Sequence, residues 1–317
     1  MGPSRCSGRR TLVTVVALAT SLTAGFAATA STAAASAHYP VVYSVVAALG
    51  GAFAPDSPPP GANNWACHPT TAHPDPVVLV NGTFANEDNN WQTLSPLLAN
   101  NGYCVFTFNY GGPPALGSIY GIHEIGASAG QLSTFVNRVT AATGAAKVDL
   151  VGHSQGGMMP HYYLRFLGGA AHVKRLVALA PSNRGTTLGG LTQLANYIPG
   201  VSTLVNAGLA NTCEACVEQE AGSTFITHLN AGGITVPGVT YTVISTKYDE
   251  VVTPYTSQAL TGSNVTNIVI QNQCPIDFDG HAGLAFDHIA LRDVLNALDP
   301  AHTSPPFCTF IPFETGG

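Results

Sequence analysis

Charged residues are scarce in this 317-residue sequence, because aspartate, glutamate, lysine and arginine together make up only 9% of it. The 11 lysines and arginines are outnumbered by 17 acidic residues, and the formal net charge is −6. So few charges exclude the charge-driven disorder of highly charged chains. The lack of positive charge also argues against nucleic acid and anionic membrane surfaces as partners.

Residues 1–37 contain no acidic residue and are typical of a secretory signal peptide. Arg5, Arg9 and Arg10 precede an apolar stretch, and "ASA" ending at Ala37 resembles a cleavage site. A membrane anchor is the alternative, which the small and polar residues of the stretch disfavour. The motif "RRTLV" leaves a twin-arginine export route open. Cleavage would leave 280 residues (317 − 37) with a balance of −9 (8 − 17), enough for one large domain.

Cysteine is also rare, and a second Cys-x-x-Cys motif is missing. Cys6 lies in the predicted signal peptide, so six cysteines remain, an even number typical of disulfides in an exported chain. Without a second motif, "CEAC" is not expected to be a redox centre or half of a metal site. Many pairings are possible. Pairing neighbours in chain order is the preferred arrangement and gives Cys67–Cys104, Cys213–Cys216 and Cys274–Cys308.

Apolar runs alternate with helical patterns along the rest of the chain. Residues 38–76 are rich in proline, glycine and alanine and predict an N-terminal arm, while residues 77–317 predict one domain. We expect strands at residues 76–82, 103–110, 147–152, 173–181, 239–246 and 265–271. We expect helices at residues 89–101, 122–143, 155–167 and 287–298, the last capped by Asp287.

This alternation predicts the α/β class, with a mostly parallel sheet and helices on both of its faces. In such sheets ligands bind beyond the carboxyl ends of the strands, so the residues just after each strand are the candidates for a site.

Between Gly185 and Cys213 the chain carries no charged residue. Residues 185–222 are therefore predicted to be an insertion over the core. One interpretation is a helical pair that only covers the core. The other is an apolar, lid-like cap that faces an apolar substrate.

After the third predicted strand comes Gly152-His153-Ser154-Gln155-Gly156, the G-x-S-x-G pattern of the nucleophile elbow in α/β-hydrolases. The tight turn from strand to helix strains the serine, and glycines make room around it. The position at a strand–helix junction makes Ser154 a candidate nucleophile. Its place at a helix N-terminus favours a developing negative charge.

A serine nucleophile needs an imidazole base that a carboxylate orients, and in this architecture the order is serine, acid, histidine. Asp249 is the first acid after the fifth predicted strand, and Glu250 is the alternative. Asp299 follows too late in the chain to precede the base.

His281, in a glycine-flanked loop before the last helix, is the predicted base, and His288 is the alternative. His153 is expected to be structural, with its side chain pointing away from the site. The other histidines show no metal-ligand spacing, so no metal and no cofactor are predicted.

The tetrahedral intermediate needs two backbone N–H donors. Gln155, after the nucleophile, is expected to supply one. Thr83, in the loop after the first strand, is expected to supply the other, and Phe84 is the alternative. Asn81-Gly82-Thr83 also matches an N-glycosylation sequon, which is discounted because a glycan there would block the site.

The motifs "NGTFAN…NW", "GHSQGG", "APSNRGT", "YDEVVTP" and "GHAG…VLNAL" resemble those of secreted class 2 lipases of the actinobacterial kind. They extend from Asn81 to Leu298. Several are also similar to the yeast lipase B branch of the same fold. One departure is the Asn81-Gly82 pair, where many bacterial relatives have His-Gly, and it affects only the surroundings of the oxyanion loop.

The resemblance implies a triad of Ser154, Asp249 and His281 and an oxyanion hole of Thr83 and Gln155. It also supports the pairing of Cys67 with Cys104. The size of the lid varies among relatives.

The implied protein is an extracellular, monomeric serine lipase or esterase of the α/β-hydrolase fold. It hydrolyses acylglycerol esters through an acyl-enzyme, acts on lipid at an oil–water interface, and does not insert stably into membranes. Alternatives on the same fold are an acyltransferase, a short-chain or polyester esterase, and a peptidase or amidase. The alternative outside enzymes is an inactive lipid-binding surface protein.

Overall fold

The computed structural model describes residues 1–4, 8, 38–51, 56–112, 119–197 and 213–317. The predicted signal peptide therefore lies almost entirely outside the described residues. The chain from Ala37 onward forms one compact unit. Among the described residues, no helix combines the length and apolar character needed to cross a membrane.

A six-stranded sheet forms the centre of this unit, with all neighbouring strands parallel and in the order β2-β1-β3-β4-β5-β6. The predicted α/β class and all six predicted strands are confirmed, although most strands are shorter than expected. Their bounds are β1 Val77–Val80, β2 Val105–Thr107, β3 Val148–His153, β4 Val173–Leu179, β5 Thr240–Ser245 and β6 Val265–Val269.

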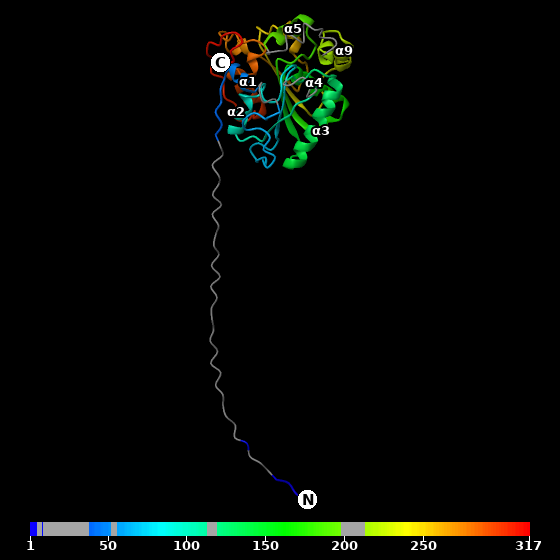
Figure 1. The fold of residues 1–317 in the computed structure, drawn as a ribbon, viewed down its shortest axis with the longest axis vertical. Coiled ribbons are helices and arrows are strands. Elements are labelled where there is room, and N and C mark those ends of the chain that lie inside the picture. The colour runs from blue at the N-terminus through cyan, green and yellow to red at the C-terminus, as the bar shows by residue number, and fades with distance from the viewer. Residues whose placement is uncertain (5–7, 9–37, 52–55, 113–118, 198–212) are drawn as a thin grey trace. The chain divides into compact units, whose positions relative to one another are not determined.

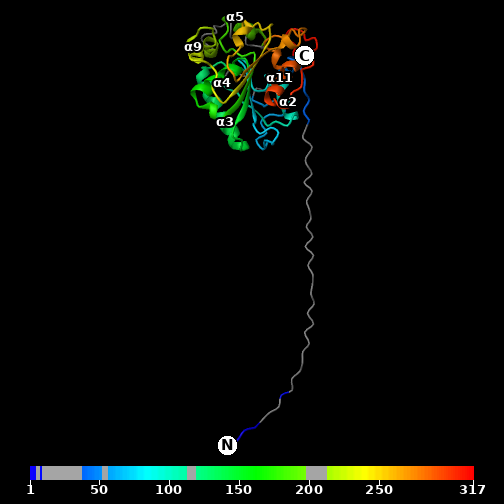
Figure 2. The same ribbon diagram turned by 180° about the vertical axis from the view of Figure 1, so that it is seen from behind.

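Helices cover both faces of the sheet, which explains why β1 is apolar at every position. Val78 and Val80 pack into the core on the side of α3 (Ile125–Thr143) and α4 (Gln155–Phe166). Val77 and Leu79 point to the other side, where α2 (Leu94–Asn100) and α11 (His288–Leu298) lie. Figures 1 and 2 show these two pairs of helices on opposite sides of the sheet. Each fully buried valine or leucine stabilises the fold by about 1.5–3 kcal/mol.

Two predicted helices begin later than the sequence pattern indicated. The helix predicted from residue 89 begins at Leu94, because the Asn86 side chain accepts hydrogen bonds from the backbone of Asp88 and Asn89 and forms a turn instead. The helix predicted from residue 122 begins at Ile125, because the Ile122 carbonyl accepts a bond from another segment. Asp287 caps α11 as predicted, accepting from Ile289 N at 2.7 Å.

Three short helices in the described residues were not predicted. They are α1 Val46–Gly51, α9 Thr224–Asn230 and α10 Ile270–Gln273. Two more, α5 Leu188–Tyr197 and α8 Glu214–Glu218, lie where a helical pair was one of the two interpretations. Single 3-10 turns occur at Gly169–Ala171, Tyr255–Gln258 and Gly283–Ala285. α5 and α8 belong to the predicted insertion at residues 185–222, of which residues 198–212 lie outside the described part.

The described part of the chain contains three disulfides, in the pairs expected from chain order: Cys67–Cys104, Cys213–Cys216 and Cys274–Cys308. Cys67–Cys104 ties residues 56–76 to the start of β2, where Asn63 N also bonds Val105 O at 2.9 Å. Closing a loop of this size (a sequence separation of 37) in the unfolded chain stabilises the fold by about 4 kcal/mol.

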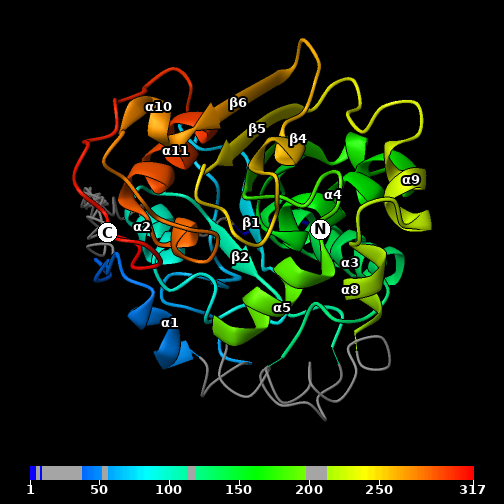
Figure 3. The ribbon, with the colours of Figure 1, turned by 90° about the horizontal axis from the view of Figure 1, so that it is seen from above.

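The strand order decides where a site forms. β1 and β3 are neighbours, but the chain continues from β1 to one side of the sheet and from β3 to the other. Outside the carboxyl ends of two such strands a crevice opens, the usual ligand position in this class. Figure 3 looks along the sheet from above, with α2 and α11 on one side and α3 and α4 on the other.

Candidate active site

Ser154 lies on a strained turn between β3 and α4. Its φ of 57° and ψ of −123° fall where residues with a side chain rarely lie. A side chain at Gly152 would clash with the backbone of Gly156, and one at Gly156 would clash with Val80. Gly157 lets α4 approach Ala178 closely, since an added Cβ would lie 3.0 Å from its methyl group. The glycines of the motif thus make the turn and its packing possible.

The loop after β1 packs directly against this turn. A Cβ added to Gly82 would lie 3.1 Å from the Cβ of Ser154. Phe84 N donates to Tyr120 O at 2.9 Å, so this alternative oxyanion donor is already engaged. Gln155 N is the first amide of α4, where helix amides have no partner within the helix. Thr83 and Gln155 therefore stay the predicted pair of donors.

His281 and Asp249 form a buried pair on the loops beyond β6 and β5. His281 Nδ1 lies 2.9 Å from Asp249 Oδ2, and both side chains are fully buried. Because the carboxylate accepts, Nδ1 donates, and the neutral ring leaves Nε2 without a proton. Burial lowers the pKa of His281, but the charge of Asp249, the hydrogen bond to it and the charge of Glu250 together outweigh that effect, so the pKa is raised above 6.5.

Asp249 is held by further donors. Its Oδ1 accepts from Val251 N at 2.9 Å and Val252 N at 2.7 Å. Its Oδ2 also accepts from Gln258 Nε2 at 2.7 Å. Gln258 was not singled out in the sequence, and no local spacing marks it, because its role appears only when the loop folds back.

The two alternative residues have other positions. Glu250 Oε2 accepts from the backbone N–H of His281 at 3.2 Å rather than from its ring. His288 Nε2 lies 3.0 Å from Phe307 O, in contact with the C-terminal segment. Neither makes the carboxylate–imidazole contact that Asp249 and His281 make.

The expectation that His153 points away from the site is wrong. Its ring lies 5.0 Å from the ring of His281, centroid to centroid, and its Nε2 lies 3.0 Å from His281 O. Burial, and then the nearby charge of His281, lower the pKa of His153 to about 3, so this ring stays neutral. The expected structural role fits this neutral state.

Apolar side chains line part of the cavity beside Ser154 and Thr83. They are Val45 and Ala48 from the N-terminal arm, Leu194 from α5 and Phe286 from the loop before α11. His281 Nε2 is buried and has no hydrogen-bond partner in the described part of the chain. Leaving such a nitrogen unpaired costs about 1–3 kcal/mol, which a functional role would explain.

Asn81 is fully buried, and its Nδ2 donates to Ala85 O at 2.9 Å, so the sequon does not present its amide. Two residues that were not predicted form hydrogen bonds with the loop after β1. They are Asn90, which accepts from Gly82 N at 2.8 Å, and Gln219, which donates to the Thr83 hydroxyl at 2.9 Å.

Within the described ranges, no three histidine, cysteine or acidic side chains converge as a metal ion requires.

The sequence is similar to known lipases over most of its length. The family model Lipase (class 2) matches residues 74–290. A triacylglycerol lipase of Pseudarthrobacter phenanthrenivorans is 34% identical over 142 residues, 43% of this chain and 40% of that protein. Lipase B of Pseudozyma antarctica is 29% identical over 237 residues, 70% of this chain and 62% of that protein. The chain thus spans less than two thirds of the length of these relatives.

Among solved structures, lipase B of Aspergillus fumigatus is similar with a TM-score of 0.59 at 19% identity, covering 79% of this chain and 57% of that one. At this identity the likeness shows the fold, which is the predicted α/β-hydrolase fold. The relationship to the lipase B branch, expected from the motifs, is also confirmed. Because the family model spans more than half of the chain, the protein belongs to the class 2 lipase family.

Proposed function

We propose that this protein is a secreted serine lipase or esterase that hydrolyses acylglycerol esters through an acyl-enzyme. The observation that carries the proposal is the buried His281–Asp249 pair. Among the described residues, Nε2 of His281 has no hydrogen-bond partner. The backbone oxygen of His281 lies 3.0 Å from Nε2 of His153, the residue before Ser154. A base oriented by a carboxylate beside a serine is the arrangement that activates a hydroxyl.

In the proposed reaction, His281 Nε2 takes the proton of the Ser154 hydroxyl as Ser154 Oγ attacks the ester carbonyl carbon. The carbonyl oxygen becomes an oxyanion that the N–H groups of Thr83 and Gln155 stabilise. The protonated imidazole then gives its proton to the alcohol, which leaves. Water repeats the sequence and releases the acid. Asp249 holds the tautomer and stabilises the imidazolium. Removing one oxyanion donor typically costs about 10²–10³-fold in kcat.

The substrate class follows from the lining of the cavity. Val45, Ala48, Leu194 and Phe286 present hydrocarbon beside Ser154, and no carboxylate or ammonium group lines this cavity among the described residues. An uncharged ester with an apolar acyl chain fits such a lining. The names of the relatives, triacylglycerol lipase and lipase B, point to the same substrate class.

The proposed domain organisation is a signal peptide at residues 1–37, an N-terminal arm at 38–76 and the catalytic domain at 77–317, with residues 185–222 as the cap. Three disulfides are consistent with an extracellular protein. We propose that the exported protein is a monomer that works on ester or lipid at an oil–water interface.

The test compares the purified wild-type protein with Ser154→Ala on p-nitrophenyl esters of increasing chain length and on a triglyceride emulsion. The proposal predicts turnover by the wild type and none above background by the variant. Adding a competing alcohol and analysing the products separates hydrolysis from acyl transfer. Retained turnover in Ser154→Ala would exclude Ser154 as the nucleophile.

A further inference from the structure

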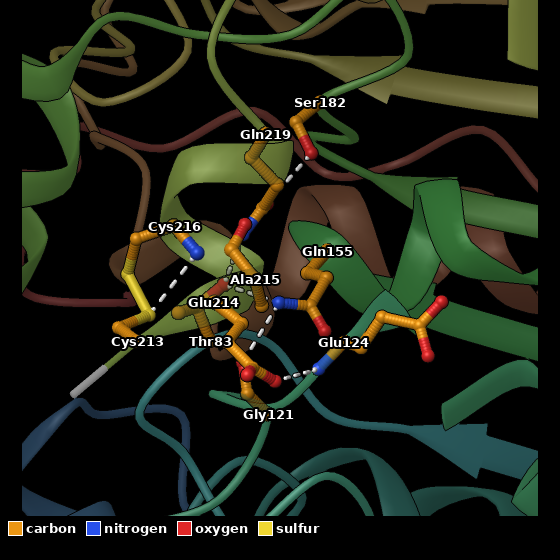
Figure 4. Close-up of a disulfide and its surroundings, with 10 residues drawn as sticks. All are labelled: Thr83, Gly121, Glu124, Gln155, Ser182, Cys213, Glu214, Ala215, Cys216 and Gln219. Carbon is orange, nitrogen blue, oxygen red and sulfur yellow. Dashed lines mark hydrogen bonds between the residues drawn. A yellow bond between two sulfur atoms is a disulfide. The ribbon is translucent and has the colours of Figure 1, made fainter. Parts of the chain in front are cut away.

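The hydroxyl of Thr83 accepts hydrogen bonds from two side-chain amides that lie far from it in the sequence. Gln155 Nε2 and Gln219 Nε2 each lie 2.9 Å from Thr83 Oγ1. Figure 4 shows the side chains of Thr83, Gln155 and Gln219 together, with Ser182 beside Gln219. All three are almost fully buried, with exposed fractions of 1% or less. The hydroxyl and both amides are therefore shielded from bulk solvent.

Backbone carbonyls fix which way each amide faces. Gln155 Nε2 also donates to Gly121 O at 2.8 Å, and Gln219 Nε2 also donates to Ala215 O at 3.2 Å. A carbonyl only accepts, so each amide presents its NH₂ group to it and to Thr83. The oxygen of Gln219 accepts from the Ser182 hydroxyl at 2.9 Å, which agrees with this orientation.

A threonine hydroxyl has two acceptor positions and one hydrogen. Since both amides donate to Thr83 Oγ1, its acceptor positions are used and its hydrogen points toward neither glutamine. Thr83 lines the cavity beside Ser154. The hydrogen is thus free to point into the space where an ester oxygen would lie.

Helix α8 holds Gln219 in place, because Gln219 directly follows it. The Cys213–Cys216 disulfide spans the first turn of α8 (Figure 4). Ala215 N donates to Ile122 O at 3.0 Å, and Glu218 Oε2 accepts from Ile125 N at 2.7 Å. These bonds fasten α8 to the segment that precedes and begins α3.

We propose that Gln219 is a positioning residue for catalysis, which acts through the Thr83 hydroxyl. Together with Gln155, it turns the hydroxyl hydrogen of Thr83 toward the ester oxygen and makes it a donor alongside the backbone N–H groups. The inference rests on the proposed ester hydrolysis at Ser154. Gln219 does not touch substrate, so its loss lowers kcat with little effect on substrate binding.

The experiment measures kcat and KM separately with p-nitrophenyl butyrate for Gln219→Leu, Thr83→Val and the double variant. We expect Gln219→Leu to lower kcat by about tenfold to a hundredfold, somewhat less than the loss of a whole oxyanion donor. KM should change by less than about threefold, since an interaction made only in the transition state affects kcat. In the double variant, kcat should equal that of Thr83→Val alone.

A second variant, Gln219→Glu, keeps the size of the side chain but offers a carboxylate, which accepts from Thr83 and draws its hydrogen away from the ester. Its kcat should fall at neutral pH and recover partly at lower pH, when the carboxyl is protonated, relative to the wild-type profile. This variant tests the proposal even if Gln219→Leu does not fold.

Asn264→Ala is the matched control. Asn264 Nδ2 donates to the carbonyls of Val236 and Val239 near the start of β5, at the opposite end of the strand from the site. We expect this variant to lose stability but to keep its kcat.

All rates are divided by the fraction of molecules that a fluorophosphonate labels. Multiplicative losses in the double variant, or a pH profile of Gln219→Glu like that of the wild type, would overturn the inference while leaving the proposed function intact. Absence of both labelling and turnover in the wild type would overturn the proposed function itself.

Discussion

Nε2 of His153 lies 3.0 Å from the backbone oxygen of His281. Because a carbonyl only accepts, Nε2 carries the proton of the neutral His153 ring, and Nδ1 accepts from Asn90 Nδ2 at 3.3 Å. Asn90 Oδ1 in turn accepts from Gly82 N at 2.8 Å. The residue before the proposed nucleophile therefore joins the oxyanion loop to the loop of the proposed base.

His153→Phe keeps a ring of similar size but removes both hydrogen bonds. We expect the free energy of unfolding to fall by about 1–3 kcal/mol, because the His281 carbonyl loses its partner. We also expect kcat to fall by about tenfold or more, because misplacing a catalytic group by a small distance is costly. Denaturant unfolding and ester turnover measure the two effects.

His161→Phe is the control for this prediction. His161 is likewise fully buried, and its Nδ1 lies 3.2 Å from Ile234 O, but it stacks on Tyr241, a residue of β5. It should lose comparable stability and keep its kcat. Equal losses of kcat in both variants would show that His153 serves only the general stability of the fold.

Substitutions of Asp249 and Glu250 should lower kcat by very different factors, because only Asp249 contacts the imidazole ring of His281. Asp249→Asn should lower kcat by about 10⁴-fold, because the imidazole loses its tautomer and its counter-charge. Glu250→Gln should leave most of kcat, since Glu250 Oε2 accepts from the backbone N–H of His281 and not from its ring. If Glu250→Gln lost more kcat than Asp249→Asn, Glu250 and not Asp249 would be the acid that orients His281.

The pH profile gives an independent check of the same pair. His281 works as a base only when neutral, and its pKa is raised, so kcat/KM should fall as the pH decreases from a point above 6.5. The negative charge of Glu250 contributes to this rise. Glu250→Gln should therefore move the acid limb to lower pH. A shift to higher pH would contradict the electrostatic explanation.

Much of this site was predictable because a parallel sheet brings the residues after its strands to one edge. Ser154, Asp249 and His281 each follow a strand, so the motif and the strand order together indicated them. The hydrogen-bond partners were not predictable in the same way. Gln219 meets Thr83 across 136 positions, and such contacts leave no local pattern.

The fold shows the same division. Long periodic helices such as α3 and α4 were predicted with small errors at their ends. α1 and α10 were missed because helices of four to six residues form through tertiary contacts rather than through their own sequence preference. The predicted orientation of the His153 side chain was wrong because the prediction considered only the turn at Ser154. It did not consider the loop of His281, which packs against His153.

Glu314 makes stability depend on pH through the C-terminal segment. Burial, helped by the negative charges of Glu250 and Asp279, raises the pKa of Glu314 to about 9, although the N–H groups of Ala282 and Gly283 donate to its carboxylate. Between its unfolded and folded pKa values, such an acid carries a proton in the folded state but not in the unfolded state. Stability should therefore fall as the pH rises from about 4.5 to about 9.

Glu314→Gln carries no titrating proton, so its melting temperature should depend less on pH over this window than that of the wild type. Thermal unfolding at pH 5, 7 and 9 (roughly the span between the two pKa values) measures the difference. Parallel profiles for the two proteins would show that Glu314 does not hold a proton in the folded state.

Ala48 on α1 lines the cavity beside Ser154, whereas Ala47 on the same helix does not. Ala48→Phe should narrow the cavity and lower kcat/KM for a long-chain ester by about tenfold relative to p-nitrophenyl acetate, the scale that one mismatched apolar group reaches. Ala47→Phe should leave this ratio unchanged. If Ala48→Phe left the ratio of the two kcat/KM values unchanged, the N-terminal arm would not form part of the substrate site.

The most direct test of the central proposal is the site of covalent labelling by a fluorophosphonate, read by mass spectrometry of the intact protein and its peptides. The proposal predicts one adduct per molecule, located on Ser154, with ester turnover lost in proportion to labelling. It also predicts no adduct in Ser154→Ala. An adduct on a different residue, or a fully labelled Ser154 with undiminished turnover, would contradict the proposed mechanism.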